Sequence, residues 1–410
     1  MKIVDLKATT VKGYHGIGPY KIIRIDTDEG IYGYGEATWG PKGPLPRDYV
    51  LALKPYIVGQ DPRDVEAVMM RIRHMGGFGG LGAHVSAVSM ALWDIAGKAA
   101  GLPVYRLLGG KIRDKVRIYC DCGSGVCLDP DNPASAYSPE AYAQRARSRK
   151  DLPEGYTILK FDLGVHGGFP SPHLFNVPGG LYETDDSYPY RGHAAERGLK
   201  AEIACVEAIK EVLGEEIGLA LDCGPGQSLP ASISLVQALE SFNVVWAEDL
   251  IQGAEDPYVD AEAHRLLTAS TSTPILTGEN VYLRQGFKRL IDQHAVDIVS
   301  PDIQNVGGLA EAKWVAEFAD LYGLLVAPHN ANLAISFMAN VHVAAAMPRN
   351  FLAFEFHATD VSWWEDMVTG VEKPLIKEGF ATVSDRPGLG IELNEDIVRQ
   401  HLVEGETYFE

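Results

Sequence analysis

Basic residues and cysteines are scarce in this sequence. Its 36 lysines and arginines are outnumbered by 55 acidic residues, which gives a formal net charge of −19. Such a charge argues against nucleic acid as a partner, because phosphates must be neutralised by Lys and Arg. The five cysteines are odd in number and show no zinc-ribbon spacing, which indicates free thiols.

Long apolar runs are also absent. No stretch approaches the ~20 residues that span a bilayer, and the first ten residues lack the apolar core of a signal peptide. No Gly-x-Gly-x-x-Gly motif follows a strand and opens a helix, which argues against a dinucleotide site. We therefore expect a cytoplasmic protein with neither a membrane nor a nucleic-acid partner. Its 410 residues are enough for two domains.

The first part of the chain has the pattern of a mixed module. Residues 2–10 and 20–27 alternate like antiparallel strands, and a third strand closes at Glu36. Helical periodicity follows and is clearest at residues 85–100. We predict an α+β domain over residues 1–114.

From residue 116 the pattern changes to strands that alternate with helices. A closed parallel barrel over residues 115–375 is predicted, and a doubly wound open sheet is the competing topology. Residues 376–410 show no further β/α unit, and we expect them to return to the first domain. The eight strand candidates are residues 116–120, 156–161, 217–221, 244–247, 274–277, 296–300, 323–327 and 351–354.

The interval between the second and third of these strands is about twice as long as one helix and a short loop need. The surplus, about residues 163–194, is rich in Gly, Pro, Tyr and His and has no periodicity. It leaves the C-terminal end of the second strand, so we expect it to lie over the barrel mouth as a lid or to form a subunit contact.

Acidic residues end three successive apolar runs. Asp222, Glu248 and Glu279 follow these runs, and the next two runs end near Asp302 and His329. In a β/α barrel all five would face the pole that carries the active site. Three oxygen ligands followed by an acid and a histidine predict a divalent-metal site beside a general base whose tautomer Asp302 fixes. Taken singly, each is as well explained as a solvated acid or a structural histidine.

Four sets of motifs follow one another along the chain: residues 87–98 with 107–110, Lys160-Phe161-Asp162, Gly278-Glu279-Asn280, and Pro301-Asp302 with Gly307-Gly308. In this order they resemble the enolase superfamily, and within it the mandelate racemase subgroup, over nearly the whole chain. The resemblance implies a modified (β/α)7β barrel of the TIM type with an α+β N-terminal capping domain and one Mg2+ per active site. It also implies removal of the proton next to a substrate carboxylate by a Lys or His base.

The resemblance also suggests roles for Lys160 and Glu355. Lys160 would be a second base on the opposite face of the substrate, but it must be neutral to accept a proton. The superfamily usually has a second Lys two residues on, where this chain has Asp162, whose charge favours protonated Lys160. An electrostatic contact to the substrate carboxylate is the alternative. Glu355 is expected to end the eighth strand and donate a hydrogen bond to the enediolate, with a salt-bridged Glu as the alternative.

Substrate specificity is expected to come from the capping domain and the insertion. Their loops carry side chains that as a group suit a polyhydroxylated acid, although each alone is more simply a fold or interface residue. These residues are Tyr14, His15, Trp39 and Lys42 in the cap, Asp162 after the second strand, and His166, Tyr188, Arg191 and His193 in the insertion.

We predict an acid-sugar dehydratase, similar to the gluconate-type enzymes of the superfamily, that forms a 2-keto-3-deoxy acid. One base takes the α-proton, and protonated His329 helps to expel the β-hydroxyl. Some sugar-acid dehydratases have a His two residues after the third-strand ligand; here Gly224 stands there, which argues against a close galactonate or mannonate dehydratase.

Three other functions stay open. A racemase or epimerase would use Lys160 and His329 as its two bases, and a cycloisomerase would use the same site. A non-catalytic binding protein predicts damaged site positions, whereas the five barrel-end residues are intact. The expected partner is a small-molecule carboxylate, and we expect a homo-oligomer.

Overall fold

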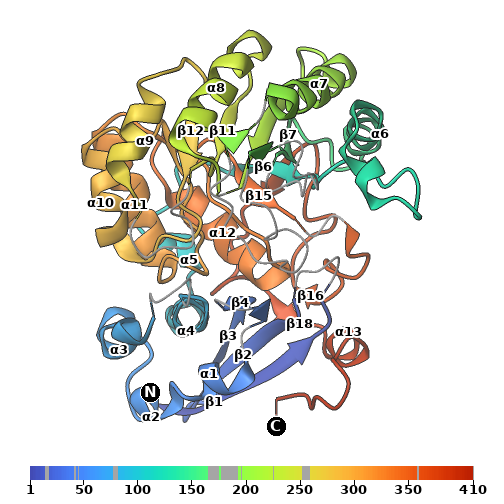
Figure 1. The fold of residues 1–410 in the computed structure, drawn as a ribbon. Coiled ribbons are helices and arrows are strands. Elements are labelled where there is room, and N and C mark those ends of the chain that lie inside the picture. Colours follow the sequence, from blue (N-terminus) through green and yellow to red (C-terminus); the bar gives the residue numbers. More distant parts are fainter. Residues whose placement is uncertain are drawn as a thin grey trace. The chain divides into compact units, whose positions relative to one another are not determined.

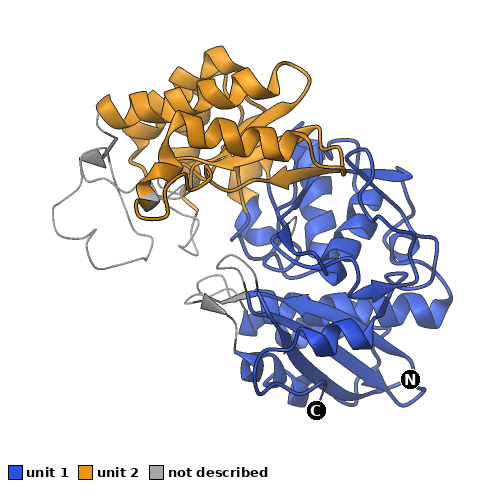
Figure 2. Ribbon diagram, turned by 90° about the vertical axis from the view of Figure 1, so that its right-hand side faces the viewer, with its two compact units in different colours: residues 1–117, 279–287, 300–410 blue, residues 118–278, 288–299 orange. Residues whose placement is uncertain are grey.

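The computed structural model describes residues 1–13, 18–40, 43–44, 46–76, 82–164, 175–176, 193–194, 196–224, 226–251, 259–357 and 360–409. The chain forms two compact units (Figure 2). Unit 1 comprises Met1–Arg117, Glu279–Phe287 and Ser300–Glu410, and unit 2 comprises Ile118–Gly278 and Lys288–Val299. Among the described residues, no helix is long and apolar enough to cross a membrane.

An antiparallel sheet begins unit 1, formed by β1 (Ile3–Val11), β2 (Tyr20–Thr27) and β3 (Tyr32–Ala37) in that order. Helix α4 (Ala83–Ala100) packs against β3. The two approach closely because β3 presents glycines to the helix: a Cβ at Gly35 would lie 2.0 Å from the carbonyl oxygen of Ala87. The smaller elements are β4 (Trp39–Gly40), β5 (Gly43–Pro44), α1 (Arg47–Leu51), α2 (Lys54–Ile57), α3 (Val65–Ile72), a 3₁₀ turn (Arg73–Met75) and α5 (Val104–Leu107).

Strands and helices then alternate along the chain (Figure 1). The strands are β6 (Lys115–Asp121), β7 (Ile158–Asp162), β10 (Gly218–Asp222), β11 (Trp246–Glu248), β12 (Ile275–Thr277), β13 (Ile298–Val299), β14 (Leu325–Val326) and β15 (Phe354–Phe356). The helices between them are α6 (Pro139–Lys150), α7 (Glu196–Leu213), α8 (Leu229–Leu239), α9 (Ala261–Thr268), α10 (Leu283–Asp292), α11 (Leu309–Leu321) and α12 (Ala334–Ala346). The described part of the chain thus has one helix in each interval between consecutive barrel strands.

The sheet order is β14-β13-β12-β11-β10-β7-β6-β15. A parallel bridge between Val326 and Phe351 brings β14 next to the segment that leads into β15. Because β15 also pairs with β6, the sheet closes on itself, which an open doubly wound sheet does not do. The predicted α/β class and modified (β/α)7β barrel with an α+β cap are confirmed.

The C-terminal segment contacts the cap sheet within unit 1. Leu402 forms a bridge to Val11, and the ring of Phe409 stacks on Tyr34. The domain boundaries at residues 114 and 375 stay predictions. The remaining elements are β8 (Phe175–Asn176) paired with β9 (His193–Ala194), β16 (Val368–Thr369) paired with β18 (Glu392–Leu393), β17 (Phe380–Thr382), α13 (Glu395–Gln400), and 3₁₀ turns at Pro133–Tyr137 and Glu240–Phe242.

Each predicted barrel strand overlaps an observed one, but the last is displaced. β15 begins at Phe354, so Glu355 lies within the strand and does not end it as expected. Most of the insertion predicted at residues 163–194 lies outside the described residues.

Unit 2 contains a buried carboxyl group whose oxygens have no hydrogen-bond partner among the described residues. It belongs to Glu202 on α7, which is fully buried. The nearby amide of Gln227 is in the same state. Both side chains lie against Gly164, where a Cβ would be 2.5 Å from Oε1 of Glu202 and 3.3 Å from Nε2 of Gln227. Burial raises the pKa of Glu202 to about 8.

This shift predicts a pH-dependent stability that one substitution removes. An unfolded Glu titrates near ~4.3, so between that pH and about 8 the folded state binds the proton more tightly. The free energy of unfolding should therefore fall as pH rises through this window, by up to about 1.4 kcal/mol per pH unit. Urea unfolding should be measured at about pH 5.5 and about pH 8.5. The free energy of unfolding of Glu202→Gln, relative to that of the wild type, should be higher at the higher pH.

Glu207→Gln is the matched control, because Glu207 is exposed on the same helix. It should keep the pH dependence of the wild type. An identical pH dependence in Glu202→Gln would show that Glu202 does not hold its proton in the folded state.

Candidate active site

Lys160 lies at the centre of an acidic group in unit 2. It is buried on β7, and its Nζ lies 3.1 Å from Asp222, 3.5 Å from Glu248 and 3.6 Å from Asp121. The register of the parallel strands brings Lys160 close to Asp222 and Glu248. Asp222 of β10 pairs with Glu248 of β11, and Ala220 of β10 pairs with Lys160 of β7. Three carboxylates at these distances favour the charged form of the lysine.

Asp121 was missed in the sequence. It ends β6 and lies opposite Lys160 in the strand register. Its Oδ1 accepts a hydrogen bond of 2.9 Å from the backbone N–H of Gly123. Like the other acids, Asp121 stands at the end of an apolar run, and this pattern could have identified it. The predicted strand, however, stopped one residue early, at Cys120. Asp162, predicted to bind substrate, is half-buried at the end of β7 and pairs with Asp222.

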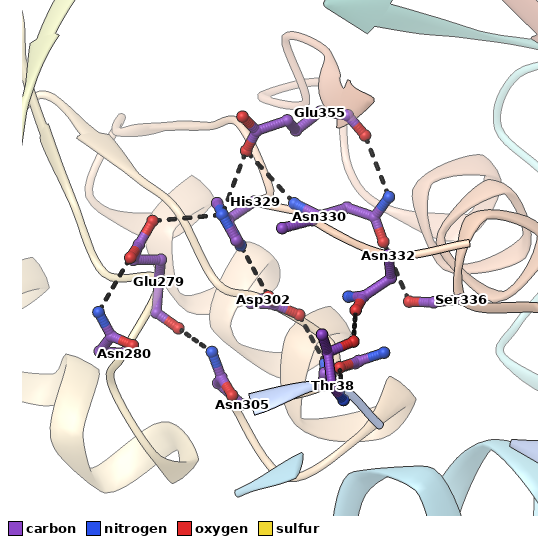
Figure 3. Close-up of polar contacts among 12 residues, drawn as sticks. Thr38, Glu279, Asn280, Asp302, Asn305, His329, Asn330, Asn332, Ser336 and Glu355 are labelled. Atoms are coloured by element: carbon purple, nitrogen blue, oxygen red, sulfur yellow. Dashed lines mark hydrogen bonds and ion pairs between the residues drawn. The ribbon is translucent and has the colours of Figure 1, made fainter. Parts of the chain in front are cut away.

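His329 lies at the centre of a second acidic group, within unit 1 (Figure 3). Its Nδ1 is 2.7 Å from Oδ2 of Asp302. Its Nε2 is 3.3 Å from Oε2 of Glu279 and 3.6 Å from Oε2 of Glu355, and the side chain is 14% exposed. The contact with Asp302 engages Nδ1, so Nε2 is the nitrogen free to exchange a proton with a substrate.

The acidic neighbours set the protonation state of this histidine. Burial by itself lowers the pKa of His329, but the carboxylates of Glu279 and Glu355 and the hydrogen bond to Asp302 outweigh it. The pKa is therefore raised well above its usual range. A protonated imidazole is the form that a general acid needs.

Glu355 is held by the buried residue Asn330, which directly follows His329 in the chain (Figure 3). The Asn330 side-chain nitrogen donates to the backbone oxygen of Glu355 at 3.3 Å, and its backbone N–H lies 3.4 Å from Oε2. Its Oδ1 accepts hydrogen bonds from Ser336 and Asn340 on α12, at 3.0 and 3.1 Å. The segment after β14 is thus tied to both β15 and α12.

Asp222, Glu248 and Glu279 form a group that can hold a metal ion, since one oxygen from each lies within 4.8 Å of the others. Asp222 and Glu248 are buried and Glu279 is half-buried. Asn280 Nδ2 donates to Oε1 of Glu279 at 2.9 Å, and Oε2 of Glu279 is the oxygen near His329. Carboxylate oxygens are the ligands that Mg2+ prefers, so the donor set fits the predicted cation.

The predicted substrate-binding side chains are mostly outside the described residues. This holds for Tyr14, His15, Lys42, His166, Tyr188 and Arg191. The backbone of Trp39 belongs to β4 and that of His193 to β9, and their side chains are not described. Their roles stay predictions.

Comparison with known proteins agrees with the fold. Residues 141–397 match the family model described as "Enolase C-terminal domain-like", and residues 6–109 match "Mandelate racemase / muconate lactonizing enzyme, N-terminal domain". The chain is 36% identical to a D-xylonate dehydratase of Haloferax volcanii over 100% of this chain and 91% of that protein. It is 26% identical to a D-galactonate dehydratase of Xanthomonas campestris pv. campestris, over 96% and 94%.

A solved structure is similar over its full length. It is a mandelate racemase/muconate lactonizing enzyme-like protein from Rubrobacter xylanophilus, with a TM-score of 0.83, 33% identity and coverage of 100% of this chain and 99% of that one. With family models matched over both its cap and its barrel, the chain belongs to the mandelate racemase/muconate lactonizing enzyme family of the enolase superfamily.

Proposed function

We propose that this protein is an acid-sugar dehydratase that removes the proton α to a substrate carboxylate and expels the β-hydroxyl. One observation carries the proposal: His329 is held by Asp302 through Nδ1 and directs Nε2 at Glu279 and Glu355. Similarity over the full chain to a D-xylonate dehydratase supports the reaction class and makes D-xylonate the first substrate to test.

A divalent cation, Mg2+ by its ligand chemistry, would be held by Asp222, Glu248 and Glu279. When bound, it supplies positive charge that offsets these carboxylates and the negative charge that builds on the substrate carboxylate as its α-proton leaves. With that charge in place, Asp222 and Glu248 hold the Lys160 ammonium less strongly, because the same carboxylates serve both cations.

Lys160 and His329 are the two side chains to which the proton transfers of the reaction are assigned. The C2–H bond of the sugar acid breaks and its proton passes to a base, for which Lys160 is the candidate in its neutral form. The electron pair of that bond becomes the C2–C3 double bond of an enol as the C3–O bond breaks. Nε2 of protonated His329 gives its proton to the departing hydroxyl, which leaves as water. The enol then tautomerises to the 2-keto-3-deoxy acid.

An alternative role for Lys160 keeps it charged throughout, as a contact to the substrate carboxylate. Its three acidic neighbours favour this form. Lys160→Met separates the two roles: loss of kcat alone supports the base, whereas a rise in KM supports the contact.

A keto-acid assay over a panel of aldonic and aldaric acids tests the proposed reaction. Release of a 2-keto-3-deoxy acid from D-xylonate, or from another sugar acid of the panel, is the expected result. An inverted acid with no keto product would identify an epimerase instead. The five free thiols support the further proposal of a reducing, cytoplasmic location.

Mg2+ should stabilise the wild-type protein against unfolding. A ligand at about 100 times its Kd adds about 2.7 kcal/mol to the free energy of unfolding. Thermal unfolding with and without Mg2+ should therefore show a higher Tm with the ion, and Asp222→Asn should lose this shift together with turnover. The control Glu202→Gln removes a different buried carboxyl group of unit 2 and should keep the shift. A full shift in Asp222→Asn would place the ion elsewhere.

His329→Asn should abolish turnover while it leaves folding and Mg2+ binding intact. Loss of a general acid or base typically costs about 10²- to 10⁴-fold in kcat. The control is His264→Asn, because His264 is a buried histidine of α9 whose Nδ1 lies 2.9 Å from the backbone oxygen of Asp260. That variant should lose stability and keep its kcat. Turnover retained in His329→Asn would show that another group carries the proton.

A further inference from the structure

Two buried polar residues lie at the end of strand β3 of the cap sheet: Glu36 within the strand, and Thr38, the first residue after it. Residues two apart on a strand face the same side. The face opposite Glu36 carries Gly33 and Gly35, whose missing Cβ atoms let β3 lie against the backbone of α4. One face of β3 is thus fixed to the cap helix, and the other presents Glu36.

Glu36 contacts the N-terminus of α12. Its Oε1 accepts a hydrogen bond of 2.6 Å from the backbone N–H of Leu333, and its Oε2 accepts one of 3.2 Å from Ser336. The first N–H groups of a helix have no partner within the helix, and Leu333, the residue before α12, carries no side-chain oxygen to bind them. Glu36 therefore caps the helix from a strand that is distant in sequence.

Thr38 contacts the segments that carry both members of the His329–Asp302 pair. Its backbone N–H donates to Oε1 of Gln304 at 3.1 Å, and the backbone N–H of Gln304 donates to Oδ1 of Asp302 at 2.6 Å. Its hydroxyl donates to the side-chain oxygen of Asn332, three residues after His329 (Figure 3). All of these groups are buried.

We propose that Glu36 and Thr38 are positioning residues for the catalytic pair. They fix the segments after β13 and β14 to the cap, and so set where Asp302 stands and where Nε2 of His329 points. The consequence for turnover rests on the proposed function, whereas the consequence for local structure does not. A displacement of about 1 Å in a catalytic group can cost about 10²-fold in rate.

Asp94 offers a matched control. It is a fully buried carboxylate of α4 that also accepts two backbone hydrogen bonds, from Leu389 at 2.8 Å and from Tyr34 at 3.3 Å. It pairs with Lys98 at 2.9 Å and contacts neither segment of the catalytic pair. Asp94→Asn thus measures how much stability and activity are lost when a buried carboxylate of the cap other than Glu36 is changed.

The first measurement needs no activity. Hydrogen exchange by mass spectrometry should show faster exchange in residues 327–340 for Glu36→Ala, by about 10-fold or more, since Leu333 and Ser336 lose their acceptor. Glu36→Gln keeps one acceptor oxygen and should show a smaller effect. Asp94→Asn should leave this segment unchanged and affect the segment around Leu389. Unchanged exchange in residues 327–340 of Glu36→Ala would overturn the proposal.

The second measurement separates positioning from general stability. On the substrate found for the wild type, Glu36→Ala should lose about 10²-fold in kcat while its KM and Mg2+ affinity change by less than about threefold. Glu36→Gln and Thr38→Val should lie between it and the wild type, and Asp94→Asn should keep its kcat. Equal kcat losses in Glu36→Ala and Asp94→Asn would overturn the proposal. If the wild type dehydrates no sugar acid, the proposed function fails. The hydrogen-exchange measurement alone then tests whether Glu36 fixes the segment that carries His329.

Discussion

Like-charge repulsion among buried carboxylates is the constraint on which this site depends. Asp121, Asp222 and Glu248 lie around one cation, Lys160. Asp302, Glu279 and Glu355 lie around the imidazole of His329. Unpaired charges in such places would cost several kcal/mol each, so each set of three acids needs a basic side chain within it. A divalent cation held by Asp222, Glu248 and Glu279, as proposed above, would offset the remaining charge and would link metal binding to the protonation of Lys160 and His329.

The scaffold holds several of these carboxylates with backbone and amide groups. Strand register brings Lys160, Asp222 and Glu248 together, because the ends of parallel neighbours lie at the same level. The segment that carries His329 has little regular structure of its own. It is held through its own Asn330, which bonds to β15 and α12, and by Glu36 of the cap strand β3. These cap contacts support the proposed positioning of the His329–Asp302 pair.

Much of this could be predicted from sequence, for a physical reason. Asp222, Glu248 and Glu279 each follow an apolar run, so a local pattern locates them, and alternation of strands and helices locates their common pole. Asp121 was not predicted as a site residue because the predicted strand ended at Cys120. The observed strand β6 includes Asp121, and this places its carboxylate beside Lys160. Glu36 could not be found, since its partners are backbone N–H groups about 300 residues away that leave no trace in residue type. Glu355 was placed at a strand end because apolar runs fix strand boundaries only within a few residues.

The reaction run in D2O and followed by NMR tests the central claim most directly. An enol formed by loss of the C2 proton and the C3 hydroxyl must take a deuteron at C3 when it becomes the keto acid. The account predicts a 2-keto-3-deoxy acid with deuterium at C3, formed only when a divalent cation is present. Recovery of the starting acid with deuterium at C2 and no keto acid would contradict dehydration, and so would keto-acid formation in a metal-free protein.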